Sequence, residues 1–156
     1  MADKIAIRQL QGLEQVSPLV TLFELEYNDA GDRLFYTRGG EEDLSTVQFR
    51  DYDNPGTVRT YDILPITVEG IDHTSTGPTA RPVLRIANVL NTFETAIGTS
   101  FDNLVGKKLF RRRTLKKYLH GEPGDSNPPI EFPRQIYIVD RIETRNAMEV
   151  SFELSS

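Results

Sequence analysis

The most regular pattern of apolar and polar positions lies at residues 147–154. The two alternating sets are Met148, Val150, Phe152 and Leu154, and Ala147, Glu149, Ser151 and Glu153. A period of two is that of a β-strand with one buried and one solvated face. Residues 134–142, rich in isoleucine, tyrosine and valine, precede it across a turn at 143–146. The two segments predict an antiparallel hairpin that buries the first set.

Five further segments combine β-branched and aromatic residues with flanking turn residues, which is typical of strands. They are residues 19–27, 33–37, 47–52, 66–71 and 83–89. Turn residues at 28–31 predict a hairpin between the first two, and Asn54-Pro55-Gly56 predicts another turn, since Pro presets φ and Gly accepts positive φ. Residues 121–133 hold four prolines and two glycines and predict a surface loop.

One helix is expected between residues 90 and 104. Steps of three and four residues place one apolar set on a single helical face: Leu90, Phe93, Ile97, Phe101 and Leu104. Asn91 and Glu94 fit a capping box. Gly98 weakens the helix by about 1 kcal/mol relative to Ala, so the helix is expected to divide there, with Ser100 capping its second part.

Residues 107–117 are ambiguous. Arg, Lys and Leu favour a helix, but the segment leads into the β-rich end of the chain and needs a pairing partner there, so we interpret it as a strand. The prediction is then a mainly β fold, an antiparallel β-sandwich or open barrel of seven or eight strands with one flanking helix. A length of 156 residues predicts a single domain, in which residues 1–17 form a partly helical or extended arm.

Composition removes several kinds of chemistry. The chain has no cysteine and only two histidines, which excludes disulfides, thiolate metal sites and cysteine nucleophiles. No apolar run approaches the roughly 18 residues that span a bilayer, and the N-terminus lacks the apolar core of a secretory signal. We therefore expect no stable membrane insertion.

Three short clusters could carry chemistry, and turn or loop structure explains each more simply. Residues 72–75 hold an Asp, a His and two hydroxyls, and residues 41–43 hold three carboxylates; glycines flank both clusters, as in loops. Asp51, Asp53 and Asp62 imitate part of a calcium loop, but an Asp replaces the bidentate Glu and the flanks look like strands. We expect no catalytic residue and no bound metal.

Charge is unevenly distributed. The net charge is −5, yet residues 107–117 carry +7, which leaves −12 on the rest of the chain. Seven cations are predicted to contact a partner: Lys107, Lys108, Arg111, Arg112, Arg113, Lys116 and Lys117. Strand side chains alternate between two faces, and mixed apolar and cationic faces suit a protein interface. The alternative is a β-barrel nucleic-acid-binding domain that uses this strand, with a steep salt dependence.

Three stretches together resemble a known family. They are residues 79–88 (TARPVLRIAN), residues 104–119, where Leu-Val-Gly precedes three arginines and Tyr-Leu, and residues 150–155 (VSFELS). In order and spacing they are similar to the N-terminal domain of minor tail protein L, the tail tip protein of lambda-like siphophages. The resemblance covers most of residues 17–156.

The resemblance implies a structural virion protein with a tail-tube-like fold, and no enzyme. Family members form a homotrimeric hub of the tail tip, or baseplate, between the distal tail ring protein and the central fibre protein. The tape measure protein is a further expected partner, and DNA passes only transiently during genome ejection. The expected location is the virion tail tip, with the host cytoplasm during assembly. Members usually continue into a cysteine-containing domain with an iron–sulfur cluster; this sequence has no cysteine, so no cofactor is expected in this chain.

Overall fold

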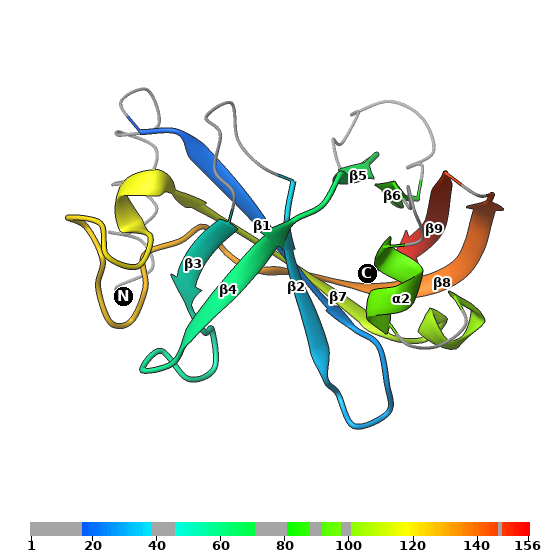
Figure 1. Ribbon diagram of the computed structural model, residues 1–156, viewed down its shortest axis with the longest axis horizontal. Coiled ribbons are helices and arrows are strands. Elements are labelled where there is room, and N and C mark those ends of the chain that lie inside the picture. Colours follow the sequence, from blue (N-terminus) through cyan, green and yellow to red (C-terminus); the bar gives the residue numbers. More distant parts are fainter. Residues whose placement is uncertain (1–16, 39–45, 71–80, 88–91, 98–100, 147) are drawn as a thin grey trace. The chain divides into compact units, whose positions relative to one another are not determined.

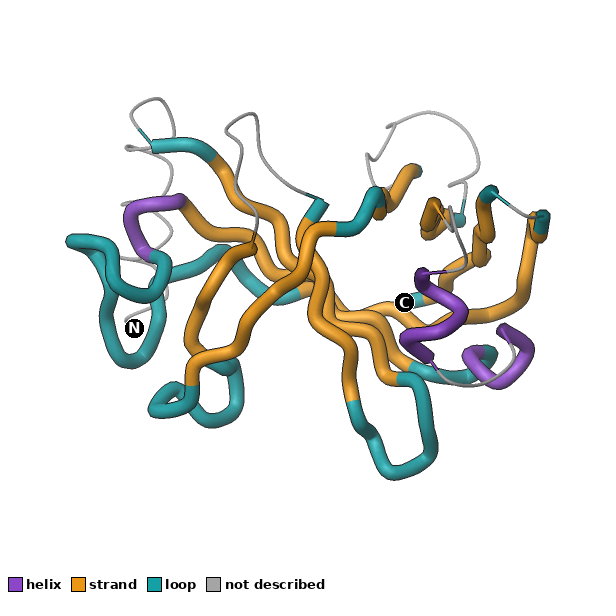
Figure 2. The backbone as a smooth tube through the Cα atoms, viewed as in Figure 1, coloured by secondary structure: helices purple, strands orange, loops and turns teal. Residues whose placement is uncertain are grey.

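A computed structural model describes residues 17–38, 46–70, 81–87, 92–97, 101–146 and 148–156 (Figure 1). Strands predominate in this part of the chain (Figure 2) and form one sheet with the order β3-β4-β2-β1-β7-β8-β9-β6-β5. The order is linear, so the sheet is not closed into a barrel. The predicted mainly β fold is confirmed, with nine strands among the described residues instead of seven or eight.

The strands are β1 (Leu19–Glu26), β2 (Arg33–Thr37), β3 (Thr46–Arg50), β4 (Val58–Ile63), β5 (Ile66–Glu69), β6 (Val83–Ala87), β7 (Lys108–Leu115), β8 (Gln135–Arg145) and β9 (Glu149–Ser155). The helical elements are α2 (Thr92–Ile97) and the 3-10 helices η2 (Phe101–Leu104) and η3 (Lys116–Tyr118). Sequence reasoning missed β4, because Tyr61 is its only buried residue and no period-two apolar signal arises. β4 pairs in parallel with β2, whereas only antiparallel pairing was expected.

The chain divides into two compact units, which are described separately. The first unit comprises the described residues within 1–23, 35–63 and 111–135. One of its core clusters consists of Val20, Leu22, Val47, Phe49, Tyr61 and Leu119. Phe35 packs against this cluster, with its ring edge-on to Tyr61 at 5.4 Å between centroids. β3 and β4 pair antiparallel across the predicted 54–56 turn, whose closure is marked by the bond from Thr57 N to Asn54 O.

The second unit comprises the described residues within 24–34, 64–110 and 136–156. Four of its strands pair antiparallel, β5 with β6, β6 with β9, and β9 with β8. Phe93 of α2 stacks on Phe101 of η2, which contacts Phe152 of β9 edge-on at 6.4 Å between centroids. The expected helix is therefore observed as two pieces, and both bury apolar residues. Leu90, Asn91, Gly98 and Ser100 lie outside the described residues.

The predicted C-terminal hairpin is confirmed as the antiparallel pair β8 and β9. Val150, Phe152 and Leu154 are buried as predicted, but Met148 is 67% exposed. The reason is local: Asn146 Oδ1 accepts hydrogen bonds from the backbone amides of Met148 and Glu149, so Met148 belongs to the turn and β9 begins after it. Ala147 lies outside the described residues.

The alternating pattern predicts Ser151 on the solvated face of the hairpin, but Ser151 is fully buried. It pairs with Arg85 of β6, and the Arg85 guanidinium reaches Glu69 and Glu149 at 2.9 and 3.1 Å. Arg81, which precedes β6, forms ion pairs with Asp140 and Glu153. Of these charged side chains, Arg85 lies on the strand beside Ser151, and long charged side chains can cover the surface beneath them.

Tyr36 of β2 gives a pH-dependent prediction. Burial, and secondarily the carboxylate of Asp62, raises the pKa of Tyr36 to about 12. A phenol in an unfolded chain titrates near 10, so the folded state holds this proton more tightly between about pH 10 and 12. The free energy of unfolding should lose this contribution as pH rises through that window, with no loss below it.

The measurement is urea unfolding across that pH range, with Tyr36→Phe as the comparison. The variant should show a shallower loss of stability above about pH 10. An identical slope in the two proteins would contradict the assignment.

Candidate protein interface on the basic strand

The basic segment is a strand from Lys108 to Leu115, followed by η3, which confirms the strand interpretation over most of its length. It also has the partner that the sequence required: Val139 N of β8 donates to Lys107 O, and Gly106 N donates to Val139 O. β7 lies inside the sheet between β1 and β8. An internal strand buries most of its side chains, so few of its cations can be fully solvated.

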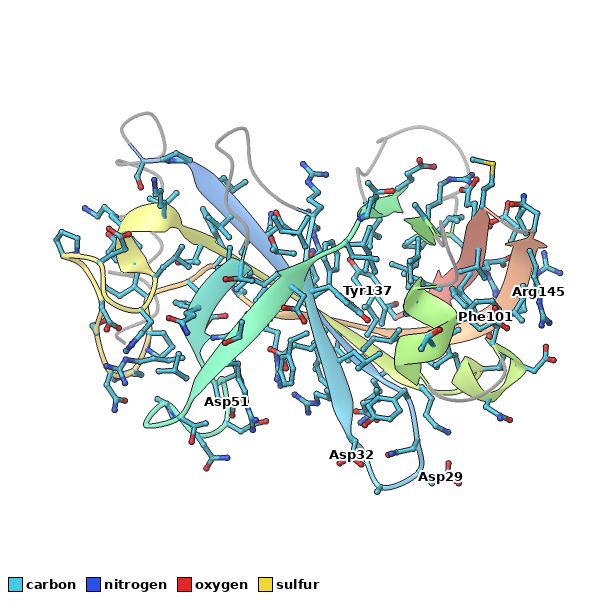
Figure 3. The ribbon with its side chains drawn as sticks, viewed as in Figure 1. Asp29, Asp32, Asp51, Phe101, Tyr137 and Arg145 are labelled. Atoms are coloured by element: carbon cyan, nitrogen blue, oxygen red, sulfur yellow. The ribbon has the colours of Figure 1, made fainter. Side chains whose placement is uncertain are left out.

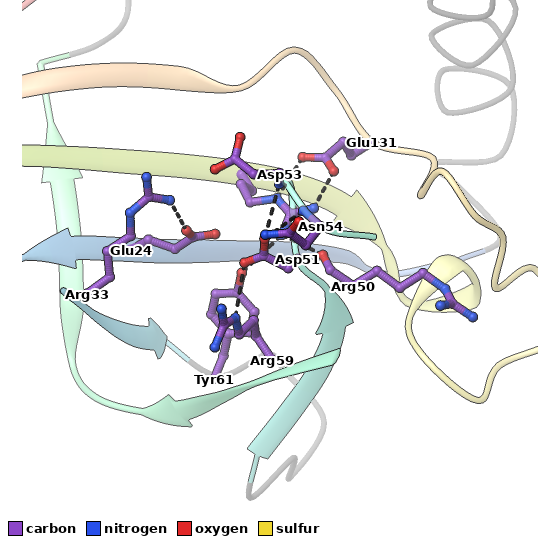
Figure 4. Close-up of polar contacts among 10 residues, drawn as sticks. Glu24, Arg33, Arg50, Asp51, Asp53, Asn54, Arg59, Tyr61 and Glu131 are labelled. Carbon is purple, nitrogen blue, oxygen red and sulfur yellow. Dashed lines mark hydrogen bonds and ion pairs between the residues drawn. The ribbon is translucent and has the colours of Figure 1, made fainter. Parts of the chain in front are cut away.

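Arg112 is the most buried of these cations, with no exposed side-chain surface. Its Nε donates to Glu131 at 2.9 Å, and its Nη2 donates to the second carboxylate oxygen. Its Nη1 donates to Arg50 O at 2.8 Å and to the Tyr61 hydroxyl at 3.1 Å; Figure 4 labels these partners. The Arg112 guanidinium also lies 4.5 Å from the centroid of the Phe49 ring. The charge is neutralised within the chain, and the side chain offers no surface to a partner.

Lys107 is also paired within the chain. Its Nζ lies 2.8 Å from Asp29 Oδ1, and this hydrogen bond, followed by the charge of Lys107, holds the pKa of Asp29 below its usual value. Arg111 Nη1 donates to Gln135 Oε1 at 2.7 Å. The positive charge of residues 107–117 is therefore partly compensated, because Asp29 and Glu131, which pair with Lys107 and Arg112, lie outside this segment of the sequence. Lys108 is exposed, and Lys116 is half-buried.

Arg113 and Lys117 have aromatic neighbours. The Arg113 guanidinium lies 5.3 Å from the Phe132 ring centroid, and Lys117 Nζ lies 5.0 Å from that of Tyr118. Both rings belong to one small apolar cluster with Leu115 and Ile130. We call Arg113, Lys117, Tyr118 and Phe132 the cation–aromatic patch. Sequence reasoning missed it because Phe132 lies in the proline-rich segment that was expected to be a plain surface loop.

The predicted loop at residues 121–133 is observed, and several hydrogen bonds join it to other parts of the first unit. Phe132 N donates to Arg113 O at 2.9 Å, and Thr114 Oγ1 donates to Ile130 O at 2.6 Å. Arg50 Nε donates to Asp125 Oδ1 at 2.9 Å, and this bond is the main cause that holds the pKa of Asp125 below its usual value. The loop therefore presents Phe132 beside Arg113 in a defined position.

Gly124 of this loop packs directly against η3, which gives a second prediction. Its amide donates to Lys117 O at 2.8 Å. A Cβ at this position would lie 2.6 Å from Lys117 O and 2.8 Å from the Tyr118 ring. Since backbone must then move, Gly124→Ala should lower the free energy of unfolding by about 1–3 kcal/mol.

Gly56→Ala is the matched control for denaturant unfolding of this variant, because a Cβ on Gly56 would meet nothing within 4 Å. Equal stabilities of the two alanine variants would show that the loop does not pack as closely as described.

The aspartates of the calcium-like pattern have other contacts. Asp51 accepts hydrogen bonds from the amides of Asp53 and Asn54 and from Arg59 Nε (Figure 4). Burial raises the pKa of Asp51, but these hydrogen bonds outweigh it and hold the pKa below its usual value. Asp62 pairs with Thr46 at the far end of the β3–β4 hairpin. The predicted turn is thus observed.

Within the described ranges, no three His, Asp or Glu side chains are grouped so that they could hold a metal ion. Residues 41–43 and 72–75 lie outside those ranges. No helix of the described part of the chain is long and apolar enough to cross a membrane.

The chain is thus a β-sheet protein whose candidate site is a strand surface of cations and aromatic rings, an arrangement that suits contact with another macromolecule. The model of the family "Phage minor tail protein L" matches residues 28–156. The chain therefore belongs to the phage minor tail protein L family, as its sequence pattern indicated. It is a structural family of the virion tail and not an enzyme family.

Proposed function

We propose that this chain is a subunit of the tail tip hub, which joins the distal tail ring to the central fibre protein and surrounds the DNA channel. The family match over residues 28–156 carries the proposal. The hub is a homotrimer assembled in the host cytoplasm and retained in the virion, where DNA passes through it transiently during ejection. The tape measure protein is a further partner, and the chain itself carries no cofactor.

The structure supports an assembly role in two ways. Cations of the basic strand and of η3 remain wholly or partly accessible, namely Lys108, Arg111, Arg113, Lys116 and Lys117. In addition, the sheet is open, and β5 ends it on one side in the described part of the chain. An open sheet edge can pair with a strand of a neighbouring subunit.

Size-exclusion chromatography with light scattering tests the proposal, first on the pure chain and then with the ring and fibre proteins. We expect a species of three times the 17.7 kDa chain mass and a larger complex when the two neighbours are added. A chain that stays monomeric with both neighbours present, or that is missing from purified tails, would refute the hub role. Binding of a DNA duplex with steep salt dependence would favour the nucleic-acid alternative.

A further inference from the structure

Two partly accessible cations of the basic segment, Arg113 and Lys117, lie beside aromatic rings. An aromatic face attracts a cation through its quadrupole but does not neutralise it. Arg113 lies over the Phe132 ring, and Lys117 lies over the Tyr118 ring. The positive charges of these two side chains are therefore not neutralised by the rings and can attract an anion. Arg112 and Lys107 differ, because carboxylates already neutralise them.

The patch is held rigidly by its own backbone. Lys117 N donates to Ser17 Oγ at 3.1 Å, and Lys117 O accepts from Gly124 N at 2.8 Å. Arg113 O accepts from Phe132 N at 2.9 Å. Tyr118 is buried, whereas Arg113, Lys117 and Phe132 are half-buried. A partner that docks here would meet backbone that is already ordered, which lowers the conformational entropy lost on binding.

The composition of the patch favours a protein over nucleic acid as its partner. Tyrosine, phenylalanine and arginine are the residues enriched at the centres of protein interfaces. A duplex would require a longer row of phosphate-binding cations, whereas two cations beside the half-buried Phe132 ring match a short segment that carries carboxylates and an apolar side chain. The net charge of −12 outside residues 107–117 would also repel a long polyanion.

We propose that the cation–aromatic patch is the docking surface for an acidic segment of another tail protein, with Arg113 and Lys117 each binding a carboxylate of that segment. This inference rests on the proposed hub function and names the chemistry of one of its contacts.

Photo-cross-linking in assembled tails identifies the partner. Pro133 is exposed and follows Phe132 directly, so Pro133→p-benzoyl-phenylalanine places the reactive group beside the patch without removing any of its members. We expect a cross-link to a tail-protein peptide that contains several Asp or Glu residues. A cross-link to DNA, a cross-link to a peptide without acids, or no cross-link in tails that contain the chain would overturn the inference.

Charge reversal gives an independent readout. Lys117→Glu should reduce incorporation of the full chain into tails by at least about tenfold, while Arg38→Glu, a charge reversal at an exposed cation outside the basic strand and the patch, should leave incorporation near normal. Reversal of the acids in the cross-linked peptide should restore assembly with Lys117→Glu. Circular dichroism checks the fold of each variant, and Lys117→Gln replaces Lys117→Glu if the latter does not fold.

The outcomes separate the two proposals. Normal incorporation of Lys117→Glu, or an equal defect in both reversals, would overturn the patch while leaving the hub role intact. Absence of the wild-type chain from tails would overturn both.

Discussion

Arg112→Met should lower the free energy of unfolding by about 3–5 kcal/mol, because it leaves a buried carboxylate without its counter-ion. Glu131 has only 8% of its side chain exposed and Arg112 has none. The substitution would also remove the donor that satisfies Arg50 O and the Tyr61 hydroxyl. Buried polar groups that lose their partners pay their full desolvation cost.

The double variant Arg112→Met/Glu131→Leu should recover most of this loss, since an apolar pair removes both buried charges together. Urea unfolding of the two single variants and the double variant forms a double-mutant cycle for the pair. Arg81→Met is the control: its side chain is 58% exposed, and exposed ion pairs contribute about 0–1 kcal/mol. A cost for Arg112→Met no larger than that of the control would contradict the buried network.

Because Arg112 is buried, a substitution at this residue cannot test the proposed interface. Charge reversal at Arg112 would put a second carboxylate beside buried Glu131, so failed assembly would report on folding and not on partner binding. Lys117, which is half-buried, and the control position Arg38, which is exposed, are the informative positions.

Phe152→Ala should cost about 3–5 kcal/mol, the usual cost of deleting a buried aromatic ring. Phe152 is fully buried and pairs with Leu84 of β6 on one side and Ile142 of β8 on the other. Its ring also contacts Phe101, which is labelled in Figure 3 with Arg145 near it. Removal of the ring leaves a cavity under η2 that these neighbours only partly refill.

Met148→Ala is the control on the same hairpin, because Met148 is 67% exposed and surface substitutions usually change stability by less than about 0.5 kcal/mol. Thermal or urea unfolding measures both. Similar costs for the two variants would show that the hairpin register is wrong.

Local patterns predicted most of the strands because strand periodicity depends on neighbouring residues alone. Val150, Phe152 and Leu154 follow this periodicity. The turns at residues 28–31 and 54–56 were predicted from local turn residues and are observed. β4 was not predicted because it has no apolar face of its own. Its pairing with β2 and β3 holds it in the sheet. Met148 was misplaced because a side-chain-capped turn holds it outside β9. Ser151 was misplaced because its burial depends on neighbouring strands, among them β6 with Arg85 opposite it, and not on local periodicity.

For the candidate site, too, some features could be predicted from the sequence and others required the tertiary structure. The sequence by itself determined the mainly β class, the family, and the concentration of seven cations in one segment, since these properties depend on residue type and order along the chain. Only the tertiary structure decided which cations remain accessible. Asp29 and Glu131 are 78 and 19 residues from the cations they neutralise, and Phe132 reaches Arg113 only because the loop folds back onto β7. Charge compensation depends on distance in space, which local sequence does not encode.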